Sequence, residues 1–266
     1  MVLDPIRVVV RHPASFRGTL RQFFGFDYRN YDSSAYWRSR ASGTGQSRVL
    51  WTNEDYNRLY RQRQLQILRR YTTGLPTDAR VLDIGCGIGV VAQMLVQCHA
   101  TLVVDGVDFR EMIDVAASEN PSPRIHYIAS DAEGYAHSID SYDLVLSSGC
   151  FSAIRRIEAL EQAIANAARA TKPGGVMLMI DPFHRWVFLA RAKYGSRDVT
   201  NLMRTLGFRE IERTGVLFWP YRLRLASSDL EGAYLARLFN QGEHLLHLLG
   251  SHYWADYKVL AFRKNA

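Results

Sequence analysis

Residues 81–89, with the sequence VLDIGCGIG, constrain the fold most, because an apolar strand runs directly into a Gly-x-Gly-x-Gly turn. Glycine tolerates positive φ angles and lacks the Cβ that would hold a ligand away from the backbone. The helix expected after the turn offers unpaired N–H groups to an acidic or polar group. The segment therefore predicts a binding site for a nucleotide-like cofactor.

The spacing of the glycines separates two kinds of cofactor. A dinucleotide fingerprint, Gly-x-Gly-x-x-Gly, needs its third glycine at the position of Val90, but here it comes one residue earlier. This argues against NAD. With an acidic residue two positions before the turn, the segment resembles motif I of the class I S-adenosylmethionine (SAM) dependent methyltransferases. The resemblance implies that the amino-acid part of SAM lies beside Asp83, Gly85, Cys86, Gly87 and Gly89.

A second buried strand is expected at 102–108, and it ends in an acidic residue where a ribose would lie. Asp108 is the predicted ribose ligand, and the resemblance implies that Phe109 packs on the adenine. The alternative role for Asp108 is to cap the helix that follows, since Asp is a preferred N-cap residue. Asp105 is a rival acidic residue, but alternation and the end of the strand place it inside the strand or at a bulge.

A third strand, at 125–129, leads into a Ser-Asp-Ala turn. This turn resembles the adenine-binding turn of the family, with the Asp131 carboxylate for the exocyclic amine and the backbone N–H of Ala132 for a ring nitrogen. A plain turn is the alternative explanation for Asp131. The fourth strand, 142–149, ends with a serine pair, and the resemblance adds Ser147 to the residues around SAM.

The remaining pattern completes an α/β fold. A Lys-Pro-Gly-Gly turn at 172–175 precedes a fifth strand, and further strands are expected at 211–218 and 257–262. Strands that are apolar on both faces suit a parallel sheet covered by helices. The resemblance extends over about 81–208 and implies a Rossmann-like doubly wound sheet of about seven strands, mostly parallel, with an antiparallel last strand.

Two regions are expected along the chain. Residues 1–75 form a basic and aromatic N-terminal arm and cap with helical character, and residues 76–266 form the SAM-binding domain with a helical insertion at about 220–250. The first 80 residues hold 14 arginines and 6 acidic residues, a balance of +8 against +7 for the whole chain. The arm could meet RNA, anionic lipid headgroups or an acidic substrate, or simply be an arginine-rich surface. RNA is the weaker prediction because no RNA-binding module is visible.

The composition indicates an intracellular globular protein. Three cysteines without paired spacing predict neither a disulfide framework nor a zinc site, and we expect a cytoplasmic location. Residues 36–40, YWRSR, resemble a segment that closes over SAM in many small-molecule methyltransferases, which implies contacts from Tyr36 and Arg40. The alternative is an aromatic pair that anchors the arm.

The acceptor is expected near residues 181–188, at the carboxyl end of the fifth strand, where ligands of doubly wound sheets bind. Methyl transfer requires alignment, exclusion of water and, for a hydroxyl acceptor, removal of one proton. His184 is the candidate general base, because histidine titrates near neutral pH. The alternative is a polar surface histidine.

An apolar helix rich in leucine is expected at 230–249. Core packing or a dimer contact is its favoured role, and contact with a membrane surface is the alternative. His244 and His247 share one face of it, but the full zinc-binding pattern is missing, so no metal is expected.

The sequence therefore predicts a SAM-dependent methyltransferase of the cytoplasm, a monomer or homodimer, that leaves S-adenosylhomocysteine as product. Its acceptor is a small molecule or a lipid- or sugar-linked group, methylated at oxygen, with peripheral membrane contact as a possibility. The alternatives are an RNA-, protein-, nitrogen- or carbon-directed methyltransferase, an NAD-dependent oxidoreductase or epimerase, and a SAM-binding subunit without catalysis.

Overall fold

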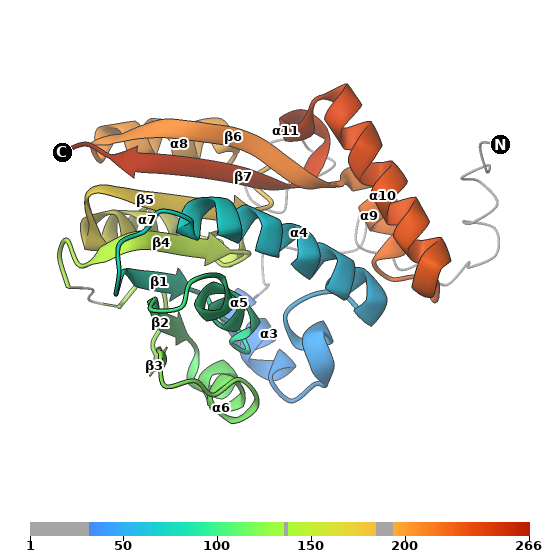
Figure 1. The fold of residues 1–266 in the computed structure, drawn as a ribbon, viewed down its shortest axis with the longest axis horizontal. Helices are drawn as coiled ribbons and strands as arrows, with labels where there is room; N and C mark the ends of the chain where they lie inside the picture. Colours follow the sequence, from blue (N-terminus) through green and yellow to red (C-terminus); the bar gives the residue numbers. More distant parts are fainter. Residues whose placement is uncertain (1–31, 136–137, 185–193) are drawn as a thin grey trace.

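The structure of the protein is a computed structural model that describes residues 32–135, 138–184 and 194–266. In these ranges seven strands form one sheet in the order β3-β2-β1-β4-β5-β7-β6 (Figure 1). All pairings among β1 to β5 are parallel, and β7 runs antiparallel to both β5 and β6. The predicted sheet is thereby confirmed. The strands are β1 Arg80–Ile84, β2 Val103–Asp108, β3 Ile125–Ala129, β4 Tyr142–Ser148, β5 Thr171–Asp181, β6 Phe208–Phe218 and β7 Ala255–Lys264.

Helices cover both faces of this sheet (Figure 1). One core cluster joins α4, α5 and α10 to the sheet, and a second joins α7 and α8 to its other face. The helices are α3 Ser33–Arg40, α4 Glu54–Thr72, α5 Val90–Cys98, α6 Arg110–Glu119, α7 Ile157–Ala170, α8 Ser196–Thr205, α9 Trp219–Leu225, α10 Gly232–Leu249 and α11 Ser251–Trp254, with short 3-10 turns η2 Gly45–Arg48 and η3 Phe151–Ala153.

The central strands are apolar on both faces because both faces are covered. In β1, Val81 belongs to one core cluster while Leu82 and Ile84 belong to the other. Each of the three side chains is at most 1 % exposed. A strand buried in this way fixes the position at which the glycine turn leaves the sheet.

The N-terminal part of the chain is packed onto the sheet where it is described. Residues 1–31, which carry much of the predicted arm, lie outside the described residues. Helix α4 begins at the N-cap Asn53, whose side chain accepts a 2.9 Å hydrogen bond from Tyr56 N. Tyr56 and Tyr60 are buried in the same core as β1. Residues 54–72 of the predicted cap therefore share the core of the sheet.

Element boundaries differ from the sequence-based expectation near the C-terminal half. Helix α8 ends at Thr205, and Gly207 then takes a φ of +83°, so β6 begins at Phe208, three residues before the strand expected at 211–218. The predicted insertion is present as α9, α10 and α11. Within the described parts of the chain, no helix is long and apolar enough to cross a membrane.

Candidate functional site

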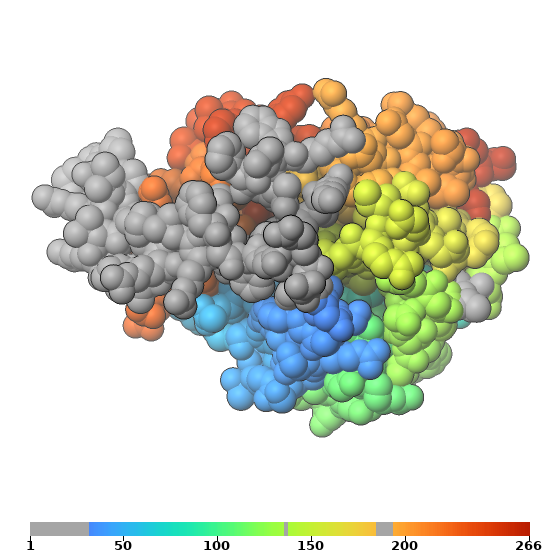
Figure 2. All heavy atoms as spheres, turned by 180° about the vertical axis from the view of Figure 1, so that it is seen from behind, coloured from blue at the N-terminus to red at the C-terminus, as the bar shows by residue number. Residues whose placement is uncertain are grey.

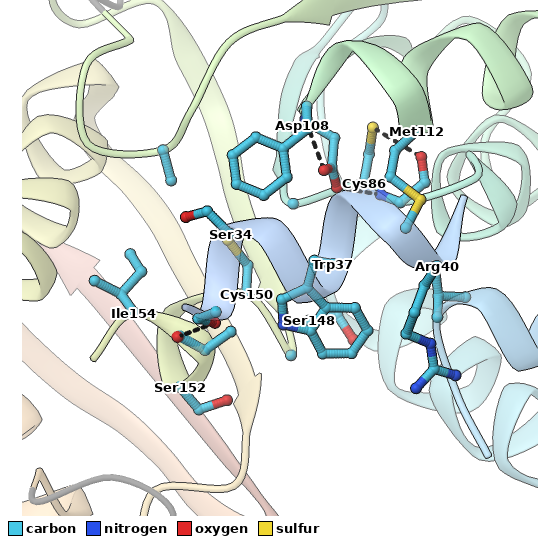
Figure 3. Close-up of a pocket in the computed structure, with 18 of the residues that line it drawn as sticks. Ser34, Trp37, Arg40, Cys86, Asp108, Met112, Ser148, Cys150, Ser152 and Ile154 are labelled. Carbon is cyan, nitrogen blue, oxygen red and sulfur yellow. Dashed lines mark hydrogen bonds between the residues drawn. The ribbon is translucent and has the colours of Figure 1, made fainter. Parts of the chain in front are cut away.

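A cavity of about 680 Å³ opens at the carboxyl ends of the parallel strands. Its lining comes from α3, from the turn after β1, from the end of β2 and from the loops after β3 and β4 (Figure 3). Helix α3, blue in Figure 2, lies beside the yellow-green surface of η3 and α7. The Ser33 hydroxyl donates a 2.7 Å hydrogen bond to the Ala153 carbonyl there. The volume and position are typical of a small-molecule site in a doubly wound sheet.

The glycine turn after β1 forms one wall of this cavity. Gly85, Gly87 and Gly89 have φ angles of +72°, +56° and +83°. A Cβ at Gly85 would lie 2.2 Å from Cβ of Cys150, and a Cβ at Gly89 would lie 2.3 Å from the Tyr127 hydroxyl. Close packing therefore requires glycine in addition to the backbone angle. Gly85, Cys86 and Gly87 line the cavity, while Gly89 is the N-cap of α5 and does not.

Asp108 lies at the end of β2 and faces the cavity (Figure 3). Its Oδ2 accepts a 2.7 Å hydrogen bond from Gly87 N, and its Oδ1 accepts one of 2.7 Å from Phe109 N. Burial raises the pKa of this carboxyl to about 6, although the two N–H groups lower it. The N-cap of α6 is Phe109, without a side-chain capping bond, so Asp108 does not cap that helix.

The rival acidic residue, Asp105, is bound by neighbouring side chains inside the fold and does not face the cavity. It is buried inside β2 and accepts hydrogen bonds from the Arg80 guanidinium at 2.7 Å and the Tyr142 hydroxyl at 2.8 Å. The His126 ring lies 3.0 Å away. Asp105 does not line the cavity. The expectation that it lies within the strand is confirmed.

The predicted adenine contacts also lie at the cavity. Phe109, Asp131 and Ala132 all line it. The Phe109 ring has the Arg38 guanidinium over it at 4.6 Å. One oxygen of Asp131 accepts a 2.5 Å hydrogen bond from Gly134 N, as in a plain turn. The turn geometry and a ligand role are compatible, because the residue faces the cavity as well.

Beneath the glycine turn, an acidic and a basic side chain are buried close together. Asp83 is 1 % exposed, and neither of its carboxylate oxygens has a hydrogen-bond partner among the described residues. Burial and the neighbouring Asp108 raise its pKa to about 7, and Arg61 opposes this. Arg61 lines the cavity and donates only to neutral groups in the bonds seen, to Gln46 Oε1 at 2.9 Å and Gln64 Oε1 at 2.7 Å.

Sequence reasoning missed Arg61 and Gln64. They lie on α4 on the face that also carries Asn57 and Tyr60, all of them buried. Polar residues that interrupt an apolar helical face at this spacing were a readable signal, because a buried arginine needs a partner. Burial lowers the pKa of Arg61, and nearby acidic groups oppose the effect.

The predicted cover over the cavity is formed by α3. The Arg40 guanidinium donates to the Tyr36 hydroxyl at 2.6 Å and to the Leu50 carbonyl at 2.7 Å. It also lies 5.3 Å from the centroid of the Trp37 ring. Tyr36, Trp37 and Arg40 all line the cavity, and Trp37 crosses its centre in Figure 3. Arg40 therefore braces the cover through its own hydrogen bonds.

The serine pair at the end of β4 corrects one expectation. Ser147 is 1 % exposed, does not line the cavity, and donates a 3.0 Å hydrogen bond to Asp181. Ser148 faces the cavity instead, and its hydroxyl accepts a 2.7 Å bond from Gln64 Nε2. Successive strand residues point to opposite sides, which explains the exchange. Burial raises the pKa of Asp181.

His184 is buried, so its interpretation as surface polarity is wrong. Nε2 donates a 2.7 Å hydrogen bond to the carbonyl of Asp256, and the Asp256 carboxylate is 3.7 Å away. Asp256 forms an ion pair with Arg222, and that pair lowers the pKa of Asp256 against the effect of burial. His184 does not line the described cavity. Residues 185–188 of the predicted acceptor segment lie outside the described residues.

The strand order, the glycine turn, and an acidic residue at the end of the second strand define a Rossmann-like fold of the class I methyltransferase type. Residues 81–175 match the family model described as "Methyltransferase domain". The matched residues therefore carry a methyltransferase domain, and this supports an enzyme of the class I SAM-dependent type.

Curated relatives and solved structures agree with this assignment. A ubiquinone biosynthesis O-methyltransferase of Coxiella burnetii is 27 % identical over 180 residues, which cover 59 % of this chain and 75 % of the relative. A trans-aconitate 2-methyltransferase of Variovorax paradoxus is 32 % identical over 42 % of this chain and 41 % of its own. The N-methyltransferase NodS of Bradyrhizobium japonicum, in complex with S-adenosylhomocysteine, shares the fold with a TM-score of 0.57 and 15 % identity, covering 89 % of this chain and all of its own.

Proposed function

We propose that this enzyme transfers the methyl group of SAM to an oxygen atom of a small-molecule acceptor. The observation that carries the proposal is the Asp108 carboxylate, which faces the same cavity as the turn around Gly85 and Gly87. A carboxylate in this place can accept hydrogen bonds from both hydroxyls of a ribose. The relative from Coxiella burnetii supports oxygen as the acceptor atom.

The side chains around the cavity fit the parts of SAM. Asp108 holds the ribose, while Phe109, Asp131 and Ala132 surround the adenine. The turn at Gly85 and Gly87, where added Cβ atoms would collide with Cys150 and Val49, leaves backbone open toward the amino-acid end. This end is a zwitterion.

The zwitterion suits the buried pair beneath the turn. We assign its carboxylate to Arg61, which has only neutral hydrogen-bond partners in the bonds seen, and its ammonium to the field of the unpaired Asp83 carboxylate. Ions in a desolvated site need partners of opposite charge. The Arg40 side chain braces α3 above them.

When bound, SAM supplies a methyl carbon already activated by a sulfonium. The protein then has to align the acceptor oxygen with that carbon and exclude water. Helix α3 covers the cavity, and Ser148 offers a hydroxyl at the end of β4. His184 stays the candidate general base. Because its Nε2–H is donated to Asp256, it can receive a proton only at Nδ1.

Calorimetry with SAM, S-adenosylhomocysteine and NAD tests the cofactor. We expect the first two to bind and NAD not to bind; tight NAD binding without SAM binding would overturn the proposal. Incubation with labelled SAM and extracts of small molecules, lipids, glycans and RNA tests the acceptor. Label in the small-molecule fraction, or in a lipid- or glycan-linked one, supports acceptor classes that the sequence predicts. Label found only in RNA would contradict both the small-molecule and the lipid- or glycan-linked acceptor. Cofactor binding without any methyl transfer would indicate a SAM-binding subunit without catalysis.

A further inference from the structure

Three aromatic side chains line the part of the cavity that extends from α4 toward β7. The ring centroid of Trp51 lies 5.5 Å from that of Tyr60 and 5.8 Å from that of Tyr257. Tyr60 and Tyr257 are 5.4 Å apart. We call these three residues the aromatic wall. All three line the cavity, together with Gly149 after β4 and Pro182 after β5, so the wall faces the edge where an acceptor would meet the methyl group.

The wall is held rigidly from behind. Asn57 accepts a 3.2 Å hydrogen bond from Trp51 N and donates one of 2.8 Å to the Trp51 carbonyl. The guanidinium of Arg222, on α9 of the insertion, lies over the Trp51 ring at 5.8 Å and does not line the cavity. Arg222 is itself fixed by the buried ion pair with Asp256. The insertion therefore sets the position of the Trp51 ring.

The charges around the wall favour an uncharged acceptor over a cationic one. The carboxylates that line the described cavity are those of Asp32 at the N-cap of α3, Asp108 at the end of β2, and Asp131 and Glu133 in the loop after β3. Behind the wall, Asp256 is neutralised by Arg222, and Arg222 already occupies a cation–π position on Trp51. An ammonium group at the wall would lie near the Arg222 guanidinium, and none of the carboxylates that line the described cavity belongs to the wall itself. A cation is unfavourable in such a place at low dielectric.

We propose that the aromatic wall binds a planar aromatic ring that carries the hydroxyl to be methylated, and that Arg222 is a positioning residue for it. The proposal rests on the proposed function for the transfer itself. Stacked or edge-to-face rings are favoured at separations of about 4.5–7 Å. The hydroxyl oxygen forms the new C–O bond with the methyl carbon, the S–C bond breaks with its electron pair left on sulfur, and the hydroxyl proton passes to water.

Binding of matched probes to the protein saturated with S-adenosylhomocysteine tests this inference. Catechol and cis-cyclohexane-1,2-diol carry the same two hydroxyls on a flat and a saturated ring, and benzylamine adds a positive charge to a flat ring. We expect catechol to bind about tenfold more tightly than either of the others in calorimetry. Equal or tighter binding of benzylamine or of the saturated diol would overturn the assignment.

Variants connect the probe to the wall. Trp51→Leu should weaken catechol about tenfold and leave the affinity for S-adenosylhomocysteine unchanged; Trp51→Phe should lie between. Arg222→Lys retains the charge and should raise the KM for catechol more than it lowers kcat. Tyr253→Leu, at an aromatic side chain that is 76 % exposed, is the control and should change nothing.

The outcomes separate the two proposals. If S-adenosylhomocysteine fails to bind the wild-type protein, the proposed function is wrong. If S-adenosylhomocysteine binds but catechol does not, only the aromatic acceptor is wrong. The same holds if the affinity for catechol is unchanged in all the wall variants. A melting curve for each variant identifies loss of fold, and the Trp51→Phe result then decides.

Discussion

The carboxylate of Asp108 accepts a 2.7 Å hydrogen bond from the backbone N–H of Gly87. This bond joins the end of β2 to the glycine turn after β1, so two motifs 21 residues apart form one surface. The turn N–H favours the ionised carboxylate, and burial opposes it. The balance leaves a group that is ready to accept ribose hydroxyls above about pH 6.

Replacing Asp108 should therefore abolish cofactor binding at neutral pH. Asp108→Ala removes the two charge-assisted hydrogen bonds that we propose from the ribose hydroxyls. We expect a loss of roughly 100-fold or more in affinity for S-adenosylhomocysteine by calorimetry. Asp105→Asn is the matched control, because Asp105 lies in the same strand but bonds to Arg80 and Tyr142. It should lower the melting temperature and leave affinity intact; the reverse pattern would exchange the roles of the two residues.

The same carboxylate should make binding depend on pH. Because the pKa of Asp108 is raised to about 6, protonation removes the acceptor as the pH falls through 6. Below that value, affinity for S-adenosylhomocysteine should fall by up to about tenfold per pH unit. Titrations at several pH values between 5 and 8 measure it. A flat profile would show that the ionised Asp108 is not the ribose acceptor.

Arg61 and Arg40 should differ in their effects on cofactor binding. Arg61 lies on the cavity floor with neutral partners, whereas Arg40 donates to Tyr36 and Leu50. We expect Arg61→Gln to weaken S-adenosylhomocysteine by about 10- to 100-fold, and Arg40→Gln by a few-fold. Adenosine, which lacks the amino-acid end, should bind both variants as it binds the wild type. A larger loss of affinity for Arg40→Gln than for Arg61→Gln would mean that Arg40, on α3, binds the carboxylate of S-adenosylhomocysteine.

Asp83 should destabilise the free protein near neutral pH. The folded protein raises the pKa of this carboxyl to about 7 from 3.8, so the folded state binds more protons than the unfolded state between about pH 4 and 7. Stability must then fall as the pH rises through this window. Asp83→Asn should raise the free energy of unfolding by roughly 1–2 kcal/mol at pH 7.5, with little change at pH 4.5. Urea denaturation at both pH values measures this, and a stabilisation equal at both would contradict it.

The sequence predicted the parts of this site that lie at the ends of the parallel strands and in the turns after them. Apolar strands and glycine turns have local patterns, so Gly85 and Asp108 could be placed from the chain alone, whereas Asp131 was assigned by the resemblance of its turn to the adenine-binding turn of the family. The spacing of Arg61 on α4 signals a buried arginine, but it does not say which cavity the side chain reaches, because that depends on how α4 packs on the sheet. The prediction named Ser147 as the cavity residue, but Ser148 holds that position. Alternation along a strand does not say which face carries the ligand.

Gly89 should be less tolerant of substitution than a glycine with a similar backbone angle. Gly74 has a φ of +90° and no atom within 4 Å of an added Cβ, while at Gly89 the Cβ would lie 2.3 Å from the Tyr127 hydroxyl. We expect Gly74→Ala to cost about 1 kcal/mol of unfolding free energy and Gly89→Ala roughly 2–4. Tyr127→Phe should restore part of the loss in a double-mutant cycle. Equal costs at the two glycines would mean that the backbone angle alone decides.

Substitutions of the adjacent serines at the end of β4 should separate effects on stability from effects on turnover. Ser147 donates to the buried Asp181, so Ser147→Ala removes one of the donors to this carboxylate and should cost about 1–3 kcal/mol of unfolding free energy. Ser148 faces the cavity and accepts from Gln64, so Ser148→Ala should change the melting temperature little and lower kcat/KM by about tenfold. Thermal melts and the rate of methyl transfer from labelled SAM measure the two effects. If Ser147→Ala lowered turnover at full stability while Ser148→Ala did not, the face of β4 assigned to the ligand would be the wrong one.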